Sequence, residues 1–306
     1  MIRRLAGLDL LRLLAILLVI GRHAPTMPNT KWAIPFTHWQ RGGRFGVDLF
    51  CGSILMNIFP YRLTRLTRAI RTKIDAARIN VGLENVSRKI HPEDTMYVSG
   101  HADHYFNVGL SALRIVQQTL KAEPRTILDF PCGYGRVLRF LAAAYPSATI
   151  YGAEIKQDAL EFCQAAFGTT SIESQSDLTN LNLEQRFDLI WCGSLVPHLN
   201  EQSTRNLLSF FKRHLSDNGV CIFTTHGEYV VNRIMSGEYA YGLSPVGQEK
   251  LLREYQHIGY GYSDYATQRG YGISAVTPEY MGQLIRVLSF TPRGWDSHQD
   301  VYSMNA

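Results

Sequence analysis

Carboxylates and glycines within residues 129–154 carry the most interpretable chemistry of this chain. Asp129 closes a short apolar run, and Gly133 and Gly135 follow it. Glu154 lies 21 residues after Gly133. A glycine turn between a strand and a helix presents backbone N–H groups to a ligand. A carboxylate at the end of the next strand can accept both ribose hydroxyls of an adenosine. The spacing therefore predicts a nucleoside site.

The elements that must position these residues follow an α/β pattern. Apolar, β-branched runs predict strands at 126–130, 149–155, 187–193 and 220–225. Helical periodicity alternates with them, at 96–120, from Arg136 onward, and at 158–167 and 201–215. The tail predicts helices at 247–257 and 278–288, and strands near Tyr260, Ile273 and Val301. This alternation predicts a Rossmann-like, doubly wound, mostly parallel seven-stranded sheet with helices on both faces and an N-terminal helical appendage.

The glycine turn itself narrows the choice of ligand. A dinucleotide fingerprint has a third glycine three residues after the second, where helix and strand pack closely. Leu138 occupies that place here, and Asp129 at the strand end instead faces the turn with a carboxylate. The favoured interpretation is therefore a protein that binds a nucleoside with a cationic group. The competing interpretation is an NAD(P)-dependent oxidoreductase.

The run Asp129-Phe-Pro-Cys-Gly-Tyr-Gly135 resembles the first motif of class I S-adenosylmethionine-dependent methyltransferases. A second stretch, Phe187-Asp-Leu-Ile-Trp-Cys-Gly-Ser-Leu-Val-Pro-His198, resembles the fourth strand and following loop of that family. The resemblance covers roughly residues 96–306 and implies S-adenosylmethionine as the cofactor. The residues that it implies for cofactor binding are Asp129, Pro131, Cys132, Gly133, Gly135, Glu154, Ile155, Asp177, Leu178 and Ser194.

Histidines near the predicted strand ends are the candidates for the acceptor side. The resemblance points His198 toward the acceptor, where a neutral imidazole takes the proton of a hydroxyl as the methyl moves. The alternative is a histidine that only caps a helix or bonds a carbonyl. His226, Trp295 and His298 are predicted to contact the substrate. The predicted acceptor is a small molecule, a sugar or a glycan. His101 and His104 have no further ligand nearby, so no metal site is predicted.

Composition limits the other function classes. The hydrophobic fraction of 45% in 306 residues is typical of a globular protein. Five scattered cysteines form neither a disulfide framework nor a zinc spacing, which favours a reducing compartment such as the cytoplasm. Residues 1–90 contain 15 Lys and Arg against 4 Asp and Glu, whereas the remainder contains 16 against 22. The predicted catalytic domain is acidic, which argues against a nucleic-acid partner.

The basic N-terminal part predicts a separate region. Residues 1–60 contain Leu8-Asp9-Leu-Leu-Arg12, His23 and Phe45-Gly-Val-Asp-Leu-Phe50, and resemble the opening of the membrane acyltransferase-3 family up to about residue 58. Residues 61–95 follow as a linker, beginning with a basic amphipathic helix at 61–78. Residues 1–78 are therefore predicted to contact the inner face of a membrane peripherally.

Two further interpretations stay open beside the enzyme. The domain from residue 96 onward is alternatively a cofactor-binding but inactive module that residues 1–78 tether to a membrane. An acyltransferase would need its missing transmembrane helices from another chain. The sequence predicts no particular oligomeric state.

Overall fold

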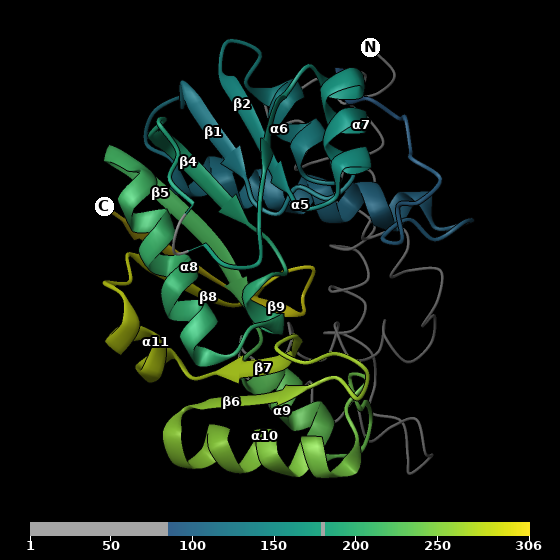
Figure 1. Ribbon diagram of the computed structural model, residues 1–306, viewed down its shortest axis with the longest axis vertical. Coiled ribbons are helices and arrows are strands. Elements are labelled where there is room, and N and C mark those ends of the chain that lie inside the picture. Colours follow the sequence, from purple (N-terminus) through teal and green to yellow (C-terminus); the bar gives the residue numbers. More distant parts are fainter. Residues whose placement is uncertain (1–84, 179–180) are drawn as a thin grey trace, which may run out of the picture. The chain divides into compact units, whose positions relative to one another are not determined.

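The computed structural model describes residues 85–178 and 181–306 (Figure 1). The chain divides into two units, Met1–Ala77 and Arg78–Ala306, and the described residues belong to the second. The predictions for the acyltransferase-like fragment and for the basic helix at 61–78 lie outside the described residues.

A seven-stranded sheet forms the centre of the described unit, in the order β3-β2-β1-β4-β5-β9-β8. The first five strands of this order are parallel, and β9 and β8 are antiparallel to their neighbours. The strands are β1 Thr126–Asp129, β2 Thr149–Glu154, β3 Thr170–Glu173, β4 Phe187–Cys192, β5 Leu215–Thr225, β8 Ser289–Trp295 and β9 Gln299–Asn305. The predicted fold class is confirmed.

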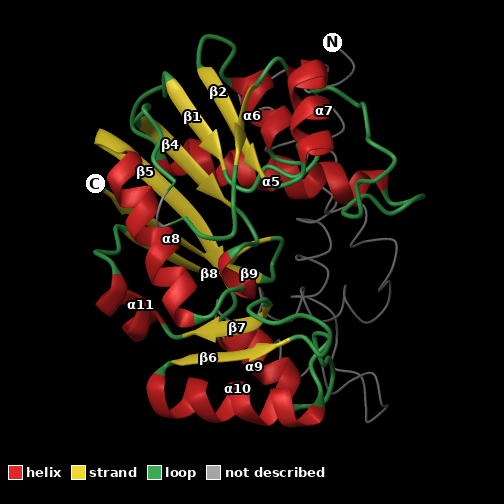
Figure 2. Ribbon diagram, in the orientation of Figure 1, coloured by secondary structure: helices red, strands yellow, loops and turns green. Residues whose placement is uncertain are grey.

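Helices cover both faces of this sheet (Figure 2). Ile127 packs into the core beneath α5 (Ala102–Thr119), α6 (Leu138–Ala144) and α7 (Gln157–Phe167). Its neighbour Leu128 packs into the core beneath α8 (Glu201–His214) and α11 (Pro278–Leu284). Successive strand residues point to opposite faces, so apolar strands without alternation build two cores at once.

A smaller layer completes the described unit. The antiparallel ribbon of β6 (Tyr260–Asp264) and β7 (Gly272–Val276) packs with α9 (Glu228–Met235) and α10 (Pro245–Ile258) through a third apolar cluster. Ser274 in β7 donates its hydroxyl to the carbonyl of Val196, at 2.8 Å. Val196 begins the short helix η3 (Val196–His198) after β4, so this layer lies against the loop that carries His198.

Several elements differ from those that periodicity predicts. Strands β3 and β8 were not predicted, because both lie at sheet edges with mostly exposed side chains. Helix α9 was not predicted either. The helix predicted from residue 96 begins only at Ala102, since residues 91–101 form turns. The helix predicted to residue 288 ends at Leu284, and β5 begins at Leu215 rather than 220.

The buried guanidinium of Arg139, in α6, fastens the glycine turn to the segment before α5. Arg139 is only 1% exposed. It donates to five oxygens: the carbonyls of Ser87, Lys89, Tyr134 and Gly135, and the hydroxyl of Tyr105. The same Tyr105 hydroxyl donates to the Asp94 carboxylate at 2.6 Å. Each of the three guanidinium nitrogens thus donates to at least one acceptor, as a buried cation requires.

Replacing Arg139 by leucine is expected to destabilise the protein by about 3–5 kcal/mol, because five buried oxygens lose their donor at once. Urea unfolding measures this free energy. The exposed Arg286→Gln variant is the control and is expected to change it by less than about 0.5 kcal/mol. An Arg139→Leu variant as stable as this control would contradict the structural role of Arg139.

Candidate active site at the carboxyl edge of the sheet

The glycine turn after β1 has two glycines with different surroundings. Both adopt left-handed backbone, with φ +51° at Gly133 and +78° at Gly135. A Cβ atom on Gly135 would overlap the ring of Phe167, so glycine is needed there for packing against α7. A Cβ atom on Gly133 would meet no atom within 4 Å. Gly133 therefore borders open space, as a backbone that a ligand approaches closely would.

The carboxylate of Glu154, at the end of β2, lies against this turn. Its Oε2 accepts the N–H of Gly133 at 3.1 Å. Its Oε1 accepts the backbone N–H groups of Ile155 and Lys156, at 2.8 Å and 3.3 Å. The structure therefore brings together the two residues that the spacing predicts to share a site. These three donors occupy three of the roughly four lone-pair sites of a carboxylate, so Glu154 retains capacity for a further donor such as a hydroxyl.

Asp129 ends β1 beneath the same turn and is 2% exposed. Burial raises the pKa of its carboxyl well above the usual range, against the opposing charge of Arg136 and a hydrogen bond from the Leu138 backbone. Its Oδ2 has no hydrogen-bond partner among the described residues. A buried oxygen without a donor is costly. A bound group that donates hydrogen bonds would remove that cost.

Pro131 and Cys132 contribute through the backbone of the turn. The Cys132 N–H donates to the Ala153 carbonyl at 2.9 Å, which joins the turn to β2. The Cys132 thiol is buried and neighbours the Cys163 thiol, and this contact together with burial raises its pKa far above the usual range. Such a thiol is not a nucleophile. Pro131, half-buried, is the residue before it in the turn.

The remaining predicted cofactor residues lie along the loops after β2, β3 and β4. Ile155 is 57% exposed directly after Glu154. Asp177 is exposed in the loop after β3, and Leu178 packs against the second core. Ser194 adopts left-handed backbone, with φ +61°. The adenine role of Asp177 and Leu178 stays a prediction.

Thr224 and Gln299 hold the loop after β4. The N–H of Ser194 donates to Thr224 Oγ1 at 2.8 Å, and Gln299 Nε2 donates to Ser194 Oγ at 2.9 Å. Thr224 Oγ1 in turn donates to Gln299 Oε1. Both partners come from strands β5 and β9, 30 and 105 residues away in sequence. No local pattern predicts such pairings.

The imidazole of His198 is oriented by strand β7. Its Nδ1 lies 2.9 Å from the carbonyl oxygen of Gly272, which can only accept, so Nδ1 carries the hydrogen and Nε2 the lone pair. The ring stacks on Tyr271, with centroids 5.0 Å apart. Burial lowers the pKa of His198, although the bond to Gly272 opposes the shift. His198 is therefore a neutral imidazole with an available acceptor nitrogen.

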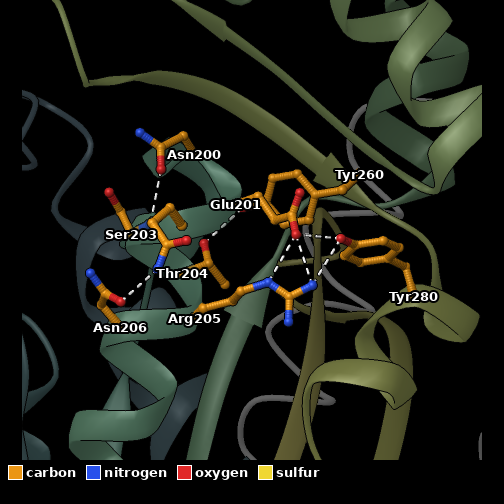
Figure 3. A network of polar contacts seen from close by, with 9 residues as sticks. Asn200, Glu201, Ser203, Thr204, Arg205, Asn206, Tyr260 and Tyr280 are labelled. Carbon is orange, nitrogen blue, oxygen red and sulfur yellow. Dashed lines mark hydrogen bonds and ion pairs between the residues drawn. The ribbon is translucent and has the colours of Figure 1, made fainter.

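The segment that follows His198 is anchored by polar contacts (Figure 3). Asn200 caps α8 by accepting the N–H of the third residue after it, at 2.8 Å. The hydroxyl of Tyr260, in β6, donates to the Leu199 carbonyl at 2.9 Å and lies 2.7 Å from Thr204 Oγ1. Tyr260 therefore fixes the loop that carries His198, which is a structural contact.

His226 lies directly after β5 and is 4% exposed. Burial lowers its pKa to about 3, and the neighbouring His198 and His298 add to the shift. A hydrogen bond to the Ser274 backbone opposes it. The Nδ1 atom of His226 has no partner among the described residues. Residues of one strand, β7, thus lie against both imidazoles, Gly272 at His198 and Ser274 at His226.

Aromatic rings surround these imidazoles and form what we call the histidine–tyrosine cluster: His198, His226, His298, Tyr241, Tyr265 and Tyr271. The rings of His198 and His226 are 6.3 Å apart, and those of His226 and His298 are 5.5 Å apart. Tyr271 is 39% exposed. Burial and the charge of Glu154 both raise the pKa of Tyr271.

Trp295 does not join this cluster. The prediction groups it with His226 and His298, but its side chain is 3% exposed within the first core. Its indole N–H donates to the Val108 carbonyl at 3.1 Å, and its ring packs edge-on against Trp191. The structure brings His226 and His298 together and leaves Trp295 as a packing residue between sheet and α5. A large apolar side chain next to polar residues gives no sequence signal that separates these roles.

The described residues also bear on metals and membranes. No group of three His, Cys, Asp or Glu side chains in the described ranges is arranged to hold a metal ion. No helix among residues 85–178 and 181–306 combines the length and hydropathy of a membrane span.

Residues 127–219 match the family model of a methyltransferase domain. This segment contains the glycine turn, Glu154 and His198. The predicted fold class and the predicted cofactor, S-adenosylmethionine, are both confirmed.

The relatives and the solved structure described next have low sequence identity to this chain. A malonyl-[acyl-carrier protein] O-methyltransferase of Anoxybacillus flavithermus is 22% identical over 152 residues, 49% of this chain and 58% of that protein. The rRNA N(6)-adenosine-methyltransferase metl-5 of Caenorhabditis elegans is 22% identical over 76 residues, 25% of this chain and 36% of that protein. The chain thus spans less than two thirds of the length of these relatives. The solved structure of the PH0226 protein from Pyrococcus horikoshii OT3 has a TM-score of 0.49 at 11% identity, over 69% of this chain and 93% of that one.

The low pKa of His226 predicts a pH dependence of stability. An unfolded histidine titrates near the usual 6.5, so between there and about 3 the unfolded chain binds the extra proton. The free energy of unfolding therefore falls as pH falls through this window. His226→Phe is expected to flatten the slope between pH 6.5 and about 5 by up to ~1.4 kcal/mol per pH unit, measured by urea unfolding at several pH values. Equal slopes in the two proteins would contradict a buried neutral His226.

Proposed function

We propose that this protein transfers the methyl group of S-adenosylmethionine to a hydroxyl oxygen of a small molecule, a sugar or a glycan. The observation that carries the proposal is the pair of Gly133 and Glu154. Gly133 borders open space in left-handed backbone, and the Glu154 carboxylate holds its amide. An open backbone beside a strand-end carboxylate suits a ligand with two ribose hydroxyls.

On the donor side, each predicted residue has a separate proposed role. Glu154 accepts the ribose hydroxyls, and Asp129, with its unpartnered Oδ2, accepts from an ammonium group of the ligand. Asp177 accepts from the adenine amino group. The loop at Ser194, fixed by Thr224 and Gln299, borders the methionine end. Rigid placement matters because methyl transfer depends chiefly on alignment and exclusion of water.

On the acceptor side, His198 is the proposed general base. S-adenosylmethionine supplies a methyl group on a sulfonium, so the protein needs only to align the acceptor oxygen and take its proton. The lone pair on Nε2 of His198 takes that proton, and the ring becomes an imidazolium. The Gly272 carbonyl on Nδ1–H stabilises this imidazolium and fixes its orientation. Tyr271, stacked on the ring, limits its rotation.

The two competing interpretations have specific weaknesses. An NAD(P)-dependent oxidoreductase needs a close helix–strand approach at the place that Leu138 occupies, and Leu138 is fully buried there. An inactive cofactor-binding module has no need of a neutral imidazole whose tautomer is set by a strand. His198 has this property, which favours an enzyme.

Cofactor binding tests the proposal directly. Isothermal titration of the full chain is expected to detect S-adenosylmethionine and S-adenosylhomocysteine and no NAD. Gly133→Val is expected to abolish this binding, because the new side chain fills the open space beside the turn. Gly168→Val is the matched control, since Gly168 also has positive φ, +70°, and an open Cβ position, but caps α7. Retained micromolar binding in Gly133→Val, or a preference for NAD, would count against the proposal.

The role of His198 is tested with acceptors from a panel of phenols and sugars, by release of S-adenosylhomocysteine. His198→Gln is expected to lower kcat about 10²–10⁴-fold, the usual contribution of a general base, and to leave S-adenosylhomocysteine affinity unchanged. Full activity in this variant would remove His198 as the base. Cofactor binding without turnover of any panel member would favour the inactive module.

A further inference from the structure

Three non-glycine residues near the end of β8 and in the turn to β9 adopt left-handed backbone. Arg293 and Asp296 have φ +51°, and Ser297 has φ +56°. The buried carboxylate of Asp300 helps to hold this shape, because its Oδ1 accepts the Arg293 N–H at 2.7 Å. Such backbone persists only where the surroundings enforce it. The direction in which the Arg293 side chain leaves the backbone is therefore fixed.

Two guanidinium groups meet at the ring of Tyr229, in α9. The Cζ of Arg293 lies 4.0 Å from the ring centroid, and the Cζ of Arg233 lies 5.7 Å from it. Arg233 forms an ion pair with Glu238 at 3.0 Å and donates to the Tyr241 hydroxyl at 3.3 Å. Arg293 donates Nε–H to the Ser297 carbonyl at 3.0 Å and has no ion pair among the described residues.

Among the described carboxylates, Glu238 forms an ion pair with Arg233, and the charge of Asp300 acts on Arg293 without an ion pair between them. Like charges held near one ring repel each other, and an additional anion would offset that repulsion. A guanidinium binds a carboxylate or a phosphate through two parallel N–H groups, and the terminal nitrogens of Arg293 have no carboxylate partner within the described ranges.

This basic site is continuous with the histidine–tyrosine cluster. The ring of His298 lies 5.4 Å from that of Tyr229 and 5.5 Å from that of His226. Tyr241, which hydrogen-bonds Arg233, also lies 5.6 Å from His226. An acceptor in contact with the cluster is therefore within reach of the two guanidinium groups.

We infer that the methyl acceptor carries an anionic oxygen group, a carboxylate or a phosphate, which Arg293 and Arg233 bind beside Tyr229 and His298. This inference rests on the proposed function. The hydroxyl that receives the methyl lies at His198, and the anionic group lies at the other end of the cluster. The two arginines then select the acceptor and orient it.

The test uses the full chain saturated with S-adenosylhomocysteine, and NMR of the arginine Nε–Hε groups. Inorganic phosphate and benzoate are the anionic probes, and benzamide is the neutral control of matched shape. A saturable shift of the Arg293 signal with phosphate or benzoate, and none with benzamide, is expected. Phosphate alone would indicate a phosphate ester as acceptor, and benzoate alone a carboxylic acid. Failure of S-adenosylhomocysteine to bind, measured beforehand, would count against methyl transfer and not against the anion site.

Arg293→Gln is expected to weaken anion binding roughly tenfold or more, because it removes a charge-assisted pair of hydrogen bonds. Its folding is checked by unchanged S-adenosylhomocysteine affinity, and Arg233→Gln is the second variant. Arg213→Gln, exposed in the last turn of α8, is the control and should leave binding unchanged. No saturable shift with either anion, an equal shift with benzamide, or full affinity in both site variants would overturn the inference.

Discussion

The hydrogen bonds that clamp the glycine turn are the constraint on which the rest of the site depends. Arg139 donates hydrogen bonds to the carbonyl oxygens of Tyr134 and Gly135, and the Glu154 carboxylate accepts the N–H of Gly133. The turn therefore keeps its left-handed backbone without side chains that fill the space beside Gly133. A site built this way is ordered before any ligand arrives, so binding costs little conformational entropy.

Strand β7 imposes a second constraint, on the acceptor side. The Gly272 carbonyl accepts from Nδ1 of His198, and the Ser274 backbone bonds the ring of His226. Gly272 and Ser274 are two positions apart in the strand, so their backbone carbonyls point to the same edge of the ribbon. Burial keeps both imidazoles neutral, which is the state in which a histidine can accept a proton. In the proposed reaction the added ribbon thus orients the general base, whereas the seven-stranded sheet holds the nucleoside.

The contact between Gly133 and Glu154 was predictable from sequence, because both residues of this proposed donor half follow short apolar strands. Asp129, Gly133 and Glu154 each stand at the junction of a strand and a turn, and parallel strands bring such junctions to one edge. For the proposed acceptor half, the sequence indicated which residue types could take part but not which residues contact one another. His198 pairs with Gly272 across 74 residues and Ser194 with Gln299 across 105, and no local periodicity encodes such contacts. Edge strands β3 and β8 were missed for a related reason, since exposed strands lack an apolar pattern.

The division between the two halves also explains where specificity arises. The nucleoside end uses backbone groups and one carboxylate, a chemistry that any adenosine ligand satisfies. The proposed acceptor end uses the side chains of His198 in η3 and of residues that follow β5 in the chain, together with the Gly272 carbonyl of β7. Arg293, in β8, lies over the ring of Tyr229 from left-handed backbone whose N–H the Asp300 carboxylate accepts. In the proposed reaction a change of acceptor is therefore expected to involve His198 and residues 226–300, while the hydrogen bonds that clamp the glycine turn stay as they are.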